Sequence, residues 1–171
     1  PEEGIATVDE LAVPVGRPVE MTLTTDTVMQ SLLIAPLTGQ IYAMPGMTTK
    51  LNFSATRTGE AEGENTQFNG DGFGRQKFTV RALEPADYGS WIARSDSGLT
   101  LDENTYATLR RRTVLADARG DLGLEKNAQP IAMTLGQPDI FQQIVAKYHG
   151  GEVERWGGIG LPQTGTTGAG E

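Results

Sequence analysis

The first half of the chain alternates between hydrophobic and polar positions in short runs that turn residues separate. The runs are residues 5–15, 19–24, 28–35, 47–54 and 76–82. A period of two is typical of strands that bury one face and expose the other. Because no helical pattern separates these runs, they predict an antiparallel β-sandwich or barrel.

After residue 84 the hydrophobic spacing becomes helical. Residues 85–92 carry an apolar stripe behind Pro85, which suits a first helical position. Thr100 and Glu103 have the spacing of a capping box, which predicts that a second helix begins there. The apolar positions of residues 137–148 predict the most regular helix of the chain.

These patterns divide the chain into three parts. Residues 1–84 predict a β-sandwich, residues 85–150 a helical appendage, and residues 151–171 a flexible tail rich in Gly and Thr. Within the appendage, residues 113–136 predict no definite element. Residues 1–4 indicate a turn just before a strand, so we expect the sequence to be a piece of a longer product.

Composition excludes several kinds of site and partner. The net charge of −8 over 171 residues argues against nucleic acid or an anionic lipid surface as a partner. The absence of cysteine excludes disulfides, thiolate copper sites and cysteine nucleophiles. No apolar run approaches the ~20 residues that cross a bilayer.

Three candidate sites are better explained by structure than by catalysis or ligand binding. His149 is the only histidine and follows the last predicted helix, where the helix dipole favours a cation. Residues 70–74 have the glycines of a nucleotide-binding loop, but they lead into a strand and not a helix. A calcium loop that begins at Asn69 would need a glutamate where Val80 stands.

Two further motifs leave alternatives open. Residues 161–165, Leu-Pro-Gln-Thr-Gly, match a sortase sorting signal, but no hydrophobic stretch and basic tail follow them. A chance match in the Gly/Thr-rich tail is therefore favoured over a wall anchor. Residues 110–112 form a run of three arginines, which indicates a solvated face or a partner of the helix dipole. Contact with a membrane headgroup or a partner subunit is the alternative.

Residues 59–78, rich in Gly, Asn and Gln, predict a loop, and their internal spacing is that of a metal site. Asn65, Asn69, Phe73 and Gln76 are separated by four, four and three residues. Two cysteines, a histidine and a methionine at these positions would form a strong copper motif. None of those residue types is present at them.

Several literal segments carry a resemblance to a known family. They are GIAT at residues 4–7, VMQSLLI at 28–34, GQIYAMPGM at 39–47, GDGFGRQKF at 70–78 and, more weakly, QPDIFQQIVAKY at 137–148. Over about residues 1–150 the chain resembles subunit II of the cytochrome bo-type ubiquinol oxidases, which are haem–copper oxidases. The resemblance implies a cupredoxin-like antiparallel β-sandwich on the periplasmic side of the bacterial inner membrane. It also implies two preceding membrane helices and a first strand upstream of Pro1.

Related cytochrome c oxidases carry a copper electron-entry site in this subunit, and the resemblance places its ligand positions in this chain. Gln30 stands for the histidine of an earlier strand, Asn65 and Asn69 for the two cysteines, Gln67 for the glutamate that gives a backbone carbonyl, Phe73 for the second histidine, and Gln76 for the methionine. Amides and a phenyl ring do not replace thiolate and imidazole donors. We therefore expect that the three positions 65, 67 and 69 fill the former site with amide hydrogen bonds, while Phe73 fills it with apolar volume.

The resemblance implies a non-catalytic role in an oxidase complex. Ubiquinol would be oxidised within the membrane, and the haem and copper would belong to subunit I, so this chain would hold no cofactor and no catalytic residue. Subunit I and other subunits are the expected partners. Ile41, Tyr42, Met44 and Met47 are the expected contacts, because exposed Met and Tyr mark interfaces, and core packing is the alternative.

Two other functions remain open from the sequence. The chain could be a copper electron-transfer domain of a cytochrome c oxidase, which would become purple when copper is added. It could also be a free-standing secreted binding module, which would purify without haem-containing subunits.

Overall fold

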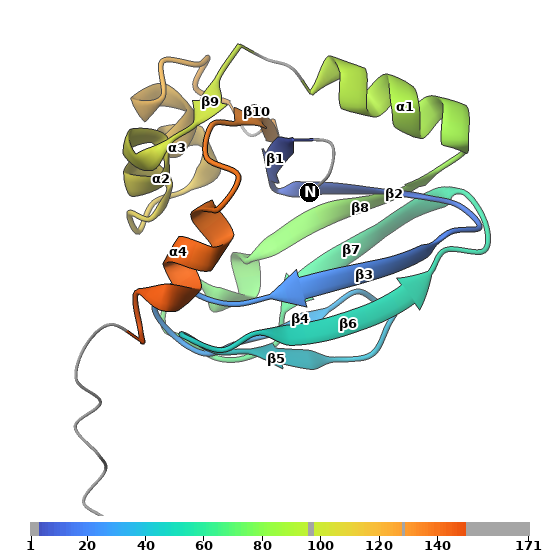
Figure 1. The fold of residues 1–171 in the computed structure, drawn as a ribbon, viewed down its shortest axis with the longest axis horizontal. Coiled ribbons are helices and arrows are strands. Elements are labelled where there is room, and N and C mark those ends of the chain that lie inside the picture. Colours follow the sequence, from blue (N-terminus) through green and yellow to red (C-terminus); the bar gives the residue numbers. More distant parts are fainter. Residues whose placement is uncertain (1–3, 96–97, 128, 150–171) are drawn as a thin grey trace, which may run out of the picture.

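The computed structural model describes residues 4–95, 98–127 and 129–149. A five-stranded sheet of order β2-β8-β7-β4-β5 faces a two-stranded sheet β3-β6, and a small third sheet has the order β1-β10-β9 (Figure 1). The strands are β1 (Ile5–Val8), β2 (Glu10–Pro14), β3 (Pro18–Leu23), β4 (Gln30–Leu33), β5 (Ile41–Ala43), β6 (Thr49–Ser54), β7 (Gly59–Asn65), β8 (Lys77–Leu83), β9 (Thr100–Leu101) and β10 (Ile131–Leu135). The helices are the 3-10 helix η1 (Phe73–Arg75) and the α-helices α1 (Pro85–Arg94), α2 (Glu103–Leu109), α3 (Leu115–Asp121) and α4 (Ile140–Ala146).

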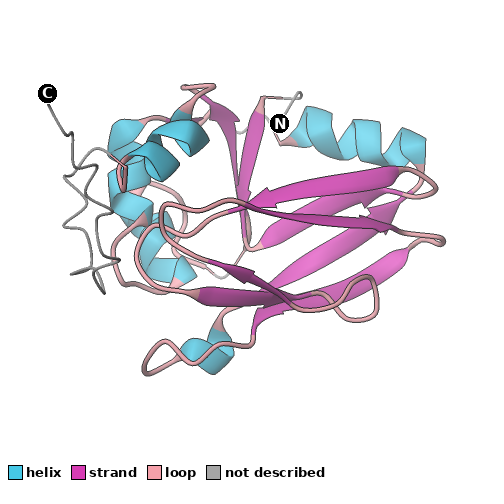
Figure 2. Cartoon of the chain, turned by 60° about the horizontal axis from the view of Figure 1, so that its bottom comes forward, coloured by secondary structure: helices cyan, strands magenta, loops and turns pink. Residues whose placement is uncertain are grey.

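The expected fold class, a mainly β, cupredoxin-like sandwich followed by helices, is confirmed. The alternating pattern of β3 and β6 buries one face of each strand to an intermediate degree and exposes the other. Val13, Ala55 and Ala82 form a buried cluster between the sheets, and Val19 and Phe53 pack against it. Figure 2 shows the helices beside one end and one edge of the sandwich. One pair differs from the antiparallel expectation, because β2 lies parallel to β8.

The run at residues 5–15 forms two strands that belong to different sheets. Asp9 separates them with a φ of 65°, a left-handed conformation at a bend in the chain. Before it, β1 pairs with β10, and after it β2 joins the main sheet. The expected sandwich and the expected appendage therefore share a sheet, and the predicted tail at 151–171 lies outside the described residues.

The prediction of a loop at residues 59–78 is wrong for its first seven residues, which form β7. Their sequence, Gly-Glu-Ala-Glu-Gly-Glu-Asn, lacks apolar alternation, so the strand depends on its neighbours. Lys77 pairs with Glu62 at 2.6 Å, as cross-strand charges do. The ring of Phe78 lies over Gly63, where an added Cβ would meet Cζ at 2.2 Å.

Three smaller expectations also differ from the structure. The predicted capping box is wrong, because Asp102 caps α2 by accepting a hydrogen bond from the backbone N–H of Thr105 at 2.8 Å. Residues 37–46, between the strands expected at 28–35 and 47–54, are expected to form a loop but contain β5, and residues 113–136 contain α3 and β10. Short elements of this kind take their conformation from their partners rather than from their own pattern.

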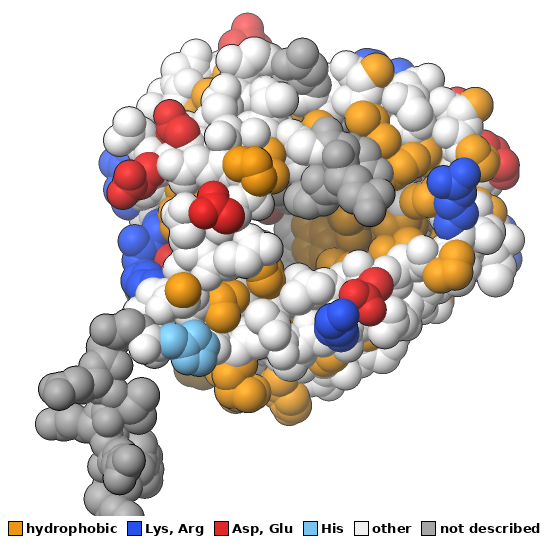
Figure 3. Space-filling model, viewed as in Figure 1, with side chains coloured by type: hydrophobic (Ala, Val, Ile, Leu, Met, Phe, Trp, Pro, Cys, Tyr) orange, Lys and Arg blue, Asp and Glu red, His pale blue; other side chains and the backbone are white. Residues whose placement is uncertain are grey.

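One side of the sandwich is open. Strand β2 is an edge of the main sheet, and β3 pairs only with β6 among the described strands. Figure 3 shows a hollow on this face, between β2 and β3, with hydrophobic side chains inside it. An added strand would cover such an edge, and the strand expected upstream of Pro1 stays a prediction.

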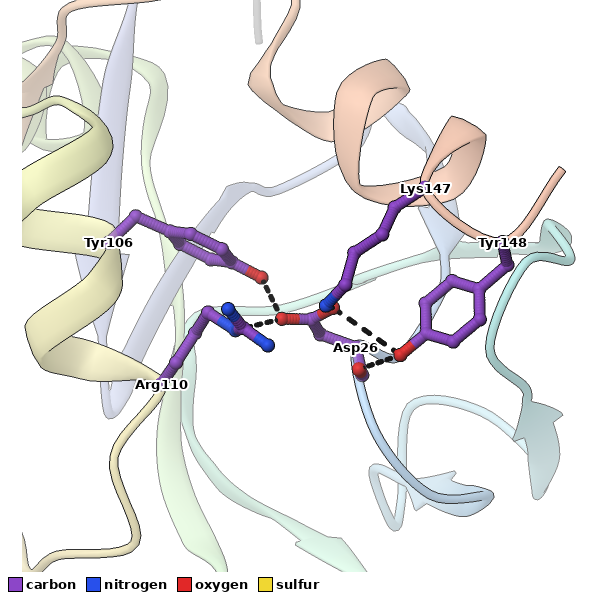
Figure 4. Close-up of polar contacts among 5 residues, drawn as sticks. All are labelled: Asp26, Tyr106, Arg110, Lys147 and Tyr148. Carbon is purple, nitrogen blue, oxygen red and sulfur yellow. Dashed lines mark hydrogen bonds and ion pairs between the residues drawn. The ribbon is translucent and has the colours of Figure 1, made fainter. Parts of the chain in front are cut away.

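Asp26, in the loop after β3, ties two helices to the sandwich (Figure 4). Its carboxylate accepts hydrogen bonds from the Tyr106 hydroxyl at 2.9 Å and the Lys147 ammonium at 2.6 Å. The Arg110 guanidinium forms an ion pair with the same carboxylate, and the Tyr148 hydroxyl donates to the Asp26 carbonyl. The Asp26 side chain is only 14% exposed. We call these five residues the Asp26 clamp, since they join α2 and the end of α4 to the β3–β4 loop.

The clamp determines the acidity of its members. Burial alone would raise the pKa of Asp26, but the hydrogen bonds from Lys147 and Tyr106 and the charge of Arg110 hold it below its usual value. Burial, together with the hydrogen bond to the Asp26 carboxylate, raises the pKa of the Tyr106 phenol. At neutral pH the Asp26 carboxylate is therefore ionised and the Tyr106 phenol neutral, beside the cations Arg110 and Lys147.

We expect Asp26→Asn to lower the free energy of unfolding by about 2 kcal/mol at pH 7, because it leaves two cations without their carboxylate. Since the pKa of Asp26 is lowered in the folded state, the contribution of its ionised form to the free energy of unfolding is complete above the unfolded pKa of about 3.9. It is lost as the pH falls through the folded value. Urea unfolding at pH 7 and at pH 3 measures both effects.

The difference between the variant and the wild type should therefore shrink at the lower pH. Asp87→Asn, which neutralises an exposed carboxylate in α1, is the control and should change little. A clamp that does not hold the helices would give equal, small effects for the two variants.

Candidate functional site

The six positions matched to copper ligands come from three segments that meet at one end of the sandwich. Gln30 begins β4, Asn65 ends β7, and the other four lie in the connection between β7 and β8 or in η1. Leu32 stands opposite Asn65 in the antiparallel pair, so the start of β4 meets the end of β7. Gln30, Asn65 and Gln76 line the same cleft.

Asn65 is the centre of a hydrogen-bond network at this end. Its Oδ1 accepts from the backbone N–H groups of Ser31 at 3.0 Å and Gln67 at 3.1 Å. Its Nδ2 donates to the Gln67 carbonyl at 2.8 Å and to Gln76 Oε1 at 2.7 Å. All four contacts of one amide are therefore made, and they join β4, β7 and the following loop.

Asn69 and Gln76 form a reciprocal amide pair. Asn69 Nδ2 donates to Gln76 Oε1 at 3.1 Å, and Gln76 Nε2 donates to Asn69 Oδ1 at 3.2 Å. Gln76 Oε1 also accepts from Asn65, so three of the matched side chains are directly joined. The residue spacing that is typical of a copper site here brings together three amide side chains that hydrogen-bond to one another.

Gln67 and Phe73 take different places. Gln67 contributes its backbone to the network, and its carbonyl, the group that the resemblance assigns to a metal, accepts from Asn65. Phe73 packs edge-to-face on Phe68, with ring centroids 5.2 Å apart. Its contact is thus with another loop residue, and its role as an apolar plug of the former site stays a prediction.

Ser31 is a member of the site that the sequence analysis did not identify. It is fully buried, and its carbonyl accepts from the Thr66 backbone N–H at 2.9 Å. Its hydroxyl accepts from Gln40 Nε2 at 2.6 Å. The available signal was a serine beside Gln30 in the middle of an otherwise apolar run.

The chemistry of this end is that of neutral hydrogen bonding. The amide and backbone groups above carry no charge, and within residues 4–95, 98–127 and 129–149 no three His, Cys, Asp or Glu side chains lie together as a metal-binding group. The donor set of amides and a phenyl ring does not suit soft copper. The arrangement therefore fits a locked loop better than an electron-transfer centre.

Exposed hydrophobic side chains surround the network. The apolar end surface consists of Val28, Met29, Tyr42, Met47 and Phe68, whose exposed fractions are 45%, 40%, 48%, 52% and 66%. Of the contacts expected from sequence, Tyr42 and Met47 belong to this surface, whereas Ile41 and Met44 are partly buried. Figure 3 shows hydrophobic side chains gathered at the bottom of the view, beside the pale blue histidine.

Comparison with curated proteins identifies clear relatives. The chain is 40% identical over 152 residues to subunit 2 of the cytochrome bo(3) ubiquinol oxidase of Pseudomonas putida, covering 88% of this chain and 44% of that protein. It is 36% identical over 154 residues to ubiquinol oxidase subunit 2 of Acetobacter aceti, covering 90% and 46%. The chain thus spans about half the length of the curated relatives that it matches.

Two other comparisons complete this result. Among solved structures, the periplasmic domain of subunit II of the cytochrome oxidase of Bradyrhizobium japonicum is 23% identical, with a TM-score of 0.49, over 51% of this chain and 63% of that one. No protein-family profile matches the chain.

We expect Asn65→Ala to destabilise the fold by about 2 kcal/mol, because it leaves the buried N–H of Ser31 without its acceptor. Asn69→Ala should cost less, since among the described residues the Asn69 side chain bonds only to Gln76. Urea unfolding gives the two free energies, and amide exchange at Ser31 should accelerate in the first variant only. Equal effects of the two variants would contradict the central position of Asn65.

Proposed function

Because the chain belongs to the family of quinol oxidase subunit 2, we propose that it is the periplasmic domain of a ubiquinol oxidase whose copper electron-entry site has been replaced by amides. The family assignment covers about half of the relatives' length. The complex as a whole would couple quinol oxidation to oxygen reduction and proton pumping. This domain would have no catalytic residue of its own.

The observation that supports this proposal best is the Asn65 network. A copper centre needs thiolates and imidazoles at the matched positions, and the chain has no cysteine. Three of those positions instead hold amides that bond to one another. The residues present therefore do not fit copper, and no electron-transfer step is assigned to them.

The chemistry of the electron donor explains why such a change is tolerated. Ubiquinol would deliver electrons inside the membrane, directly to haem and then to a haem–copper centre in subunit I. A copper relay on the periplasmic side would have no donor to serve. The loop is then free to be stabilised by hydrogen bonds alone.

The location follows from the same proposal. The domain would lie on the periplasmic side of the bacterial inner membrane, attached through membrane helices that precede it in the full-length product. None of the described helices is long and apolar enough to cross a membrane.

We propose that the apolar end surface contacts subunit I. Met and aromatic residues are enriched at interfaces, and four such side chains, together with Val28, are exposed around one end of the sandwich. Ile41 and Met44 lie beneath them and would support Tyr42 and Met47 rather than make most of the contact. Phe68 lies in the same connection as most of the network, and Val28 and Met29 directly precede Gln30, so the network would hold this part of the contact surface in position.

Tyr42→Ser combined with Met47→Ser should reduce retention of the haem-containing subunits about tenfold, because large side chains dominate the binding energy of an interface. The full-length gene product is purified from detergent extract, and haem absorbance is measured per mole of this chain. Arg57→Gln, which changes an exposed side chain in the β6–β7 connection outside that surface, is the control.

The control should retain haem as the wild type does. Full retention by the double variant would exclude this surface as the contact. A wild-type product that purifies without haem would instead support the free-standing binding module.

A further inference from the structure

A cleft of about 1110 Å³ lies between the end of the sandwich and the segment that joins α2 to α3. One side consists of β-strand and loop residues, including Gln30, Asn65 and residues 71–72. The other side consists of Leu109 and residues 111–118. A cavity of this size can hold a small ligand, and its lining mixes apolar side chains with many polar and charged ones.

Of the three arginines at residues 110–112, Arg111 and Arg112 line this cleft. Arg110 belongs to the Asp26 clamp, and Arg111 pairs with Asp121 at 3.6 Å. Arg112 lines the cleft, and its Nη2 donates to the backbone carbonyl of Asp71 at 3.1 Å. A carbonyl does not neutralise a guanidinium, so Arg112 keeps its full positive charge.

Arg75 brings a second guanidinium to the same place. It lines the cleft, and its Nη2 lies 3.3 Å from the point where a Cβ on Gly72 would stand. No described carboxylate lies within ion-pair distance of Arg75. Arg75 and Arg112 therefore flank the Asp71–Gly72 peptide as two cations without a carboxylate partner.

The other polar groups of the cleft support binding of an anion. Glu64 and Asp117 also line the cleft. The Glu64 carboxylate lies 3.8 Å from the Lys77 ammonium, and the Asp117 carboxylate forms an ion pair with Lys126. The hydroxyl oxygen of Thr25 is buried and has no hydrogen-bond partner in the described part of the chain. Asp9 also lines the cleft, and burial raises the pKa of its carboxyl group. Asp71 is exposed, and its carboxylate opposes an anion near the two arginines.

We propose that this cleft binds a phosphate-bearing anion, held by the guanidinium groups of Arg75 and Arg112. Two N–H groups of a guanidinium can donate to two oxygens of one phosphate, and this geometry is more specific than a general positive field. The net charge of −8 gives the molecule no such general field. Leu109, Val114 and Leu115 form an apolar wall that would contact the rest of a phospholipid, whereas a free phosphate would use the arginines alone.

Titration of the chain with inorganic phosphate, followed by amide NMR at low ionic strength, tests the proposal. Saturable shifts should appear at Gly72 and in residues 111–115, and the double variant Arg75→Gln, Arg112→Gln should bind at least about tenfold more weakly. Arg57→Gln removes an exposed arginine from outside the cleft and should bind as the wild type does. Asp71→Asn should bind more tightly, because it removes the opposing carboxylate.

A second titration with a soluble short-chain phosphatidylglycerol separates the two sources of phosphate. Binding about tenfold tighter than inorganic phosphate, lost again in Val114→Ser, assigns the site to a lipid headgroup with its apolar part on the wall. Equal affinities assign it to free phosphate. Absence of saturable shifts up to about 20 mM in both titrations, or equal weakening by Arg57→Gln, would overturn the proposal. Unfolding curves of each variant show that it remains folded.

Discussion

The amide side chain of Asn65 holds together the end of the sandwich that contains the positions matched to copper ligands. Buried backbone groups must be paired. At this end the backbone N–H of Ser31 donates its hydrogen bond to Asn65 Oδ1. The same amide reaches Gln67 and Gln76, so one side chain joins a strand, a loop and the start of the next strand. Hydrogen bonds here fix the conformation of the loop, as metal–ligand bonds would in a copper site.

The Asp26 clamp has a parallel role on the helical side. It joins groups that are 80 and 121 residues apart in the sequence, and so fixes α2 and α4 against the β3–β4 loop. Arg110 lies in the clamp, and Arg112 lies two residues later in the wall of the cleft. Because Asp26 holds Arg110 at the end of α2, the clamp also restricts the position of Arg112, two residues later.

The sequence predicted what depends on local pattern or on the literal family segments. Alternation identified β3 and β6, Pro85 and the stripe behind it identified α1, and the family spacing identified Asn65, Asn69 and Gln76 as neighbours. It failed where partners decide the conformation. Strand β7 is almost entirely polar or Gly, and it is paired on both sides.

The clamp and the buried Ser31 were missed for the same physical reason. An aspartate in a turn and a serine in an apolar run carry no local signal of partners that lie far away in the sequence. The position of Phe73 against Phe68 also depends on how the loop folds back on itself, which spacing alone does not determine. Residue spacing therefore identified the site, and tertiary contacts determine what each member does.

The most direct test of the central claim is a copper titration followed by visible absorption. The wild-type chain should stay colourless, since its amides do not bind soft copper. A variant that restores the family ligands should develop intense charge-transfer bands, because the loop has kept their spacing; its substitutions are Gln30→His, Asn65→Cys, Gln67→Glu, Asn69→Cys, Phe73→His and Gln76→Met. Colour in the wild type, or a folded variant that remains colourless, would contradict the account.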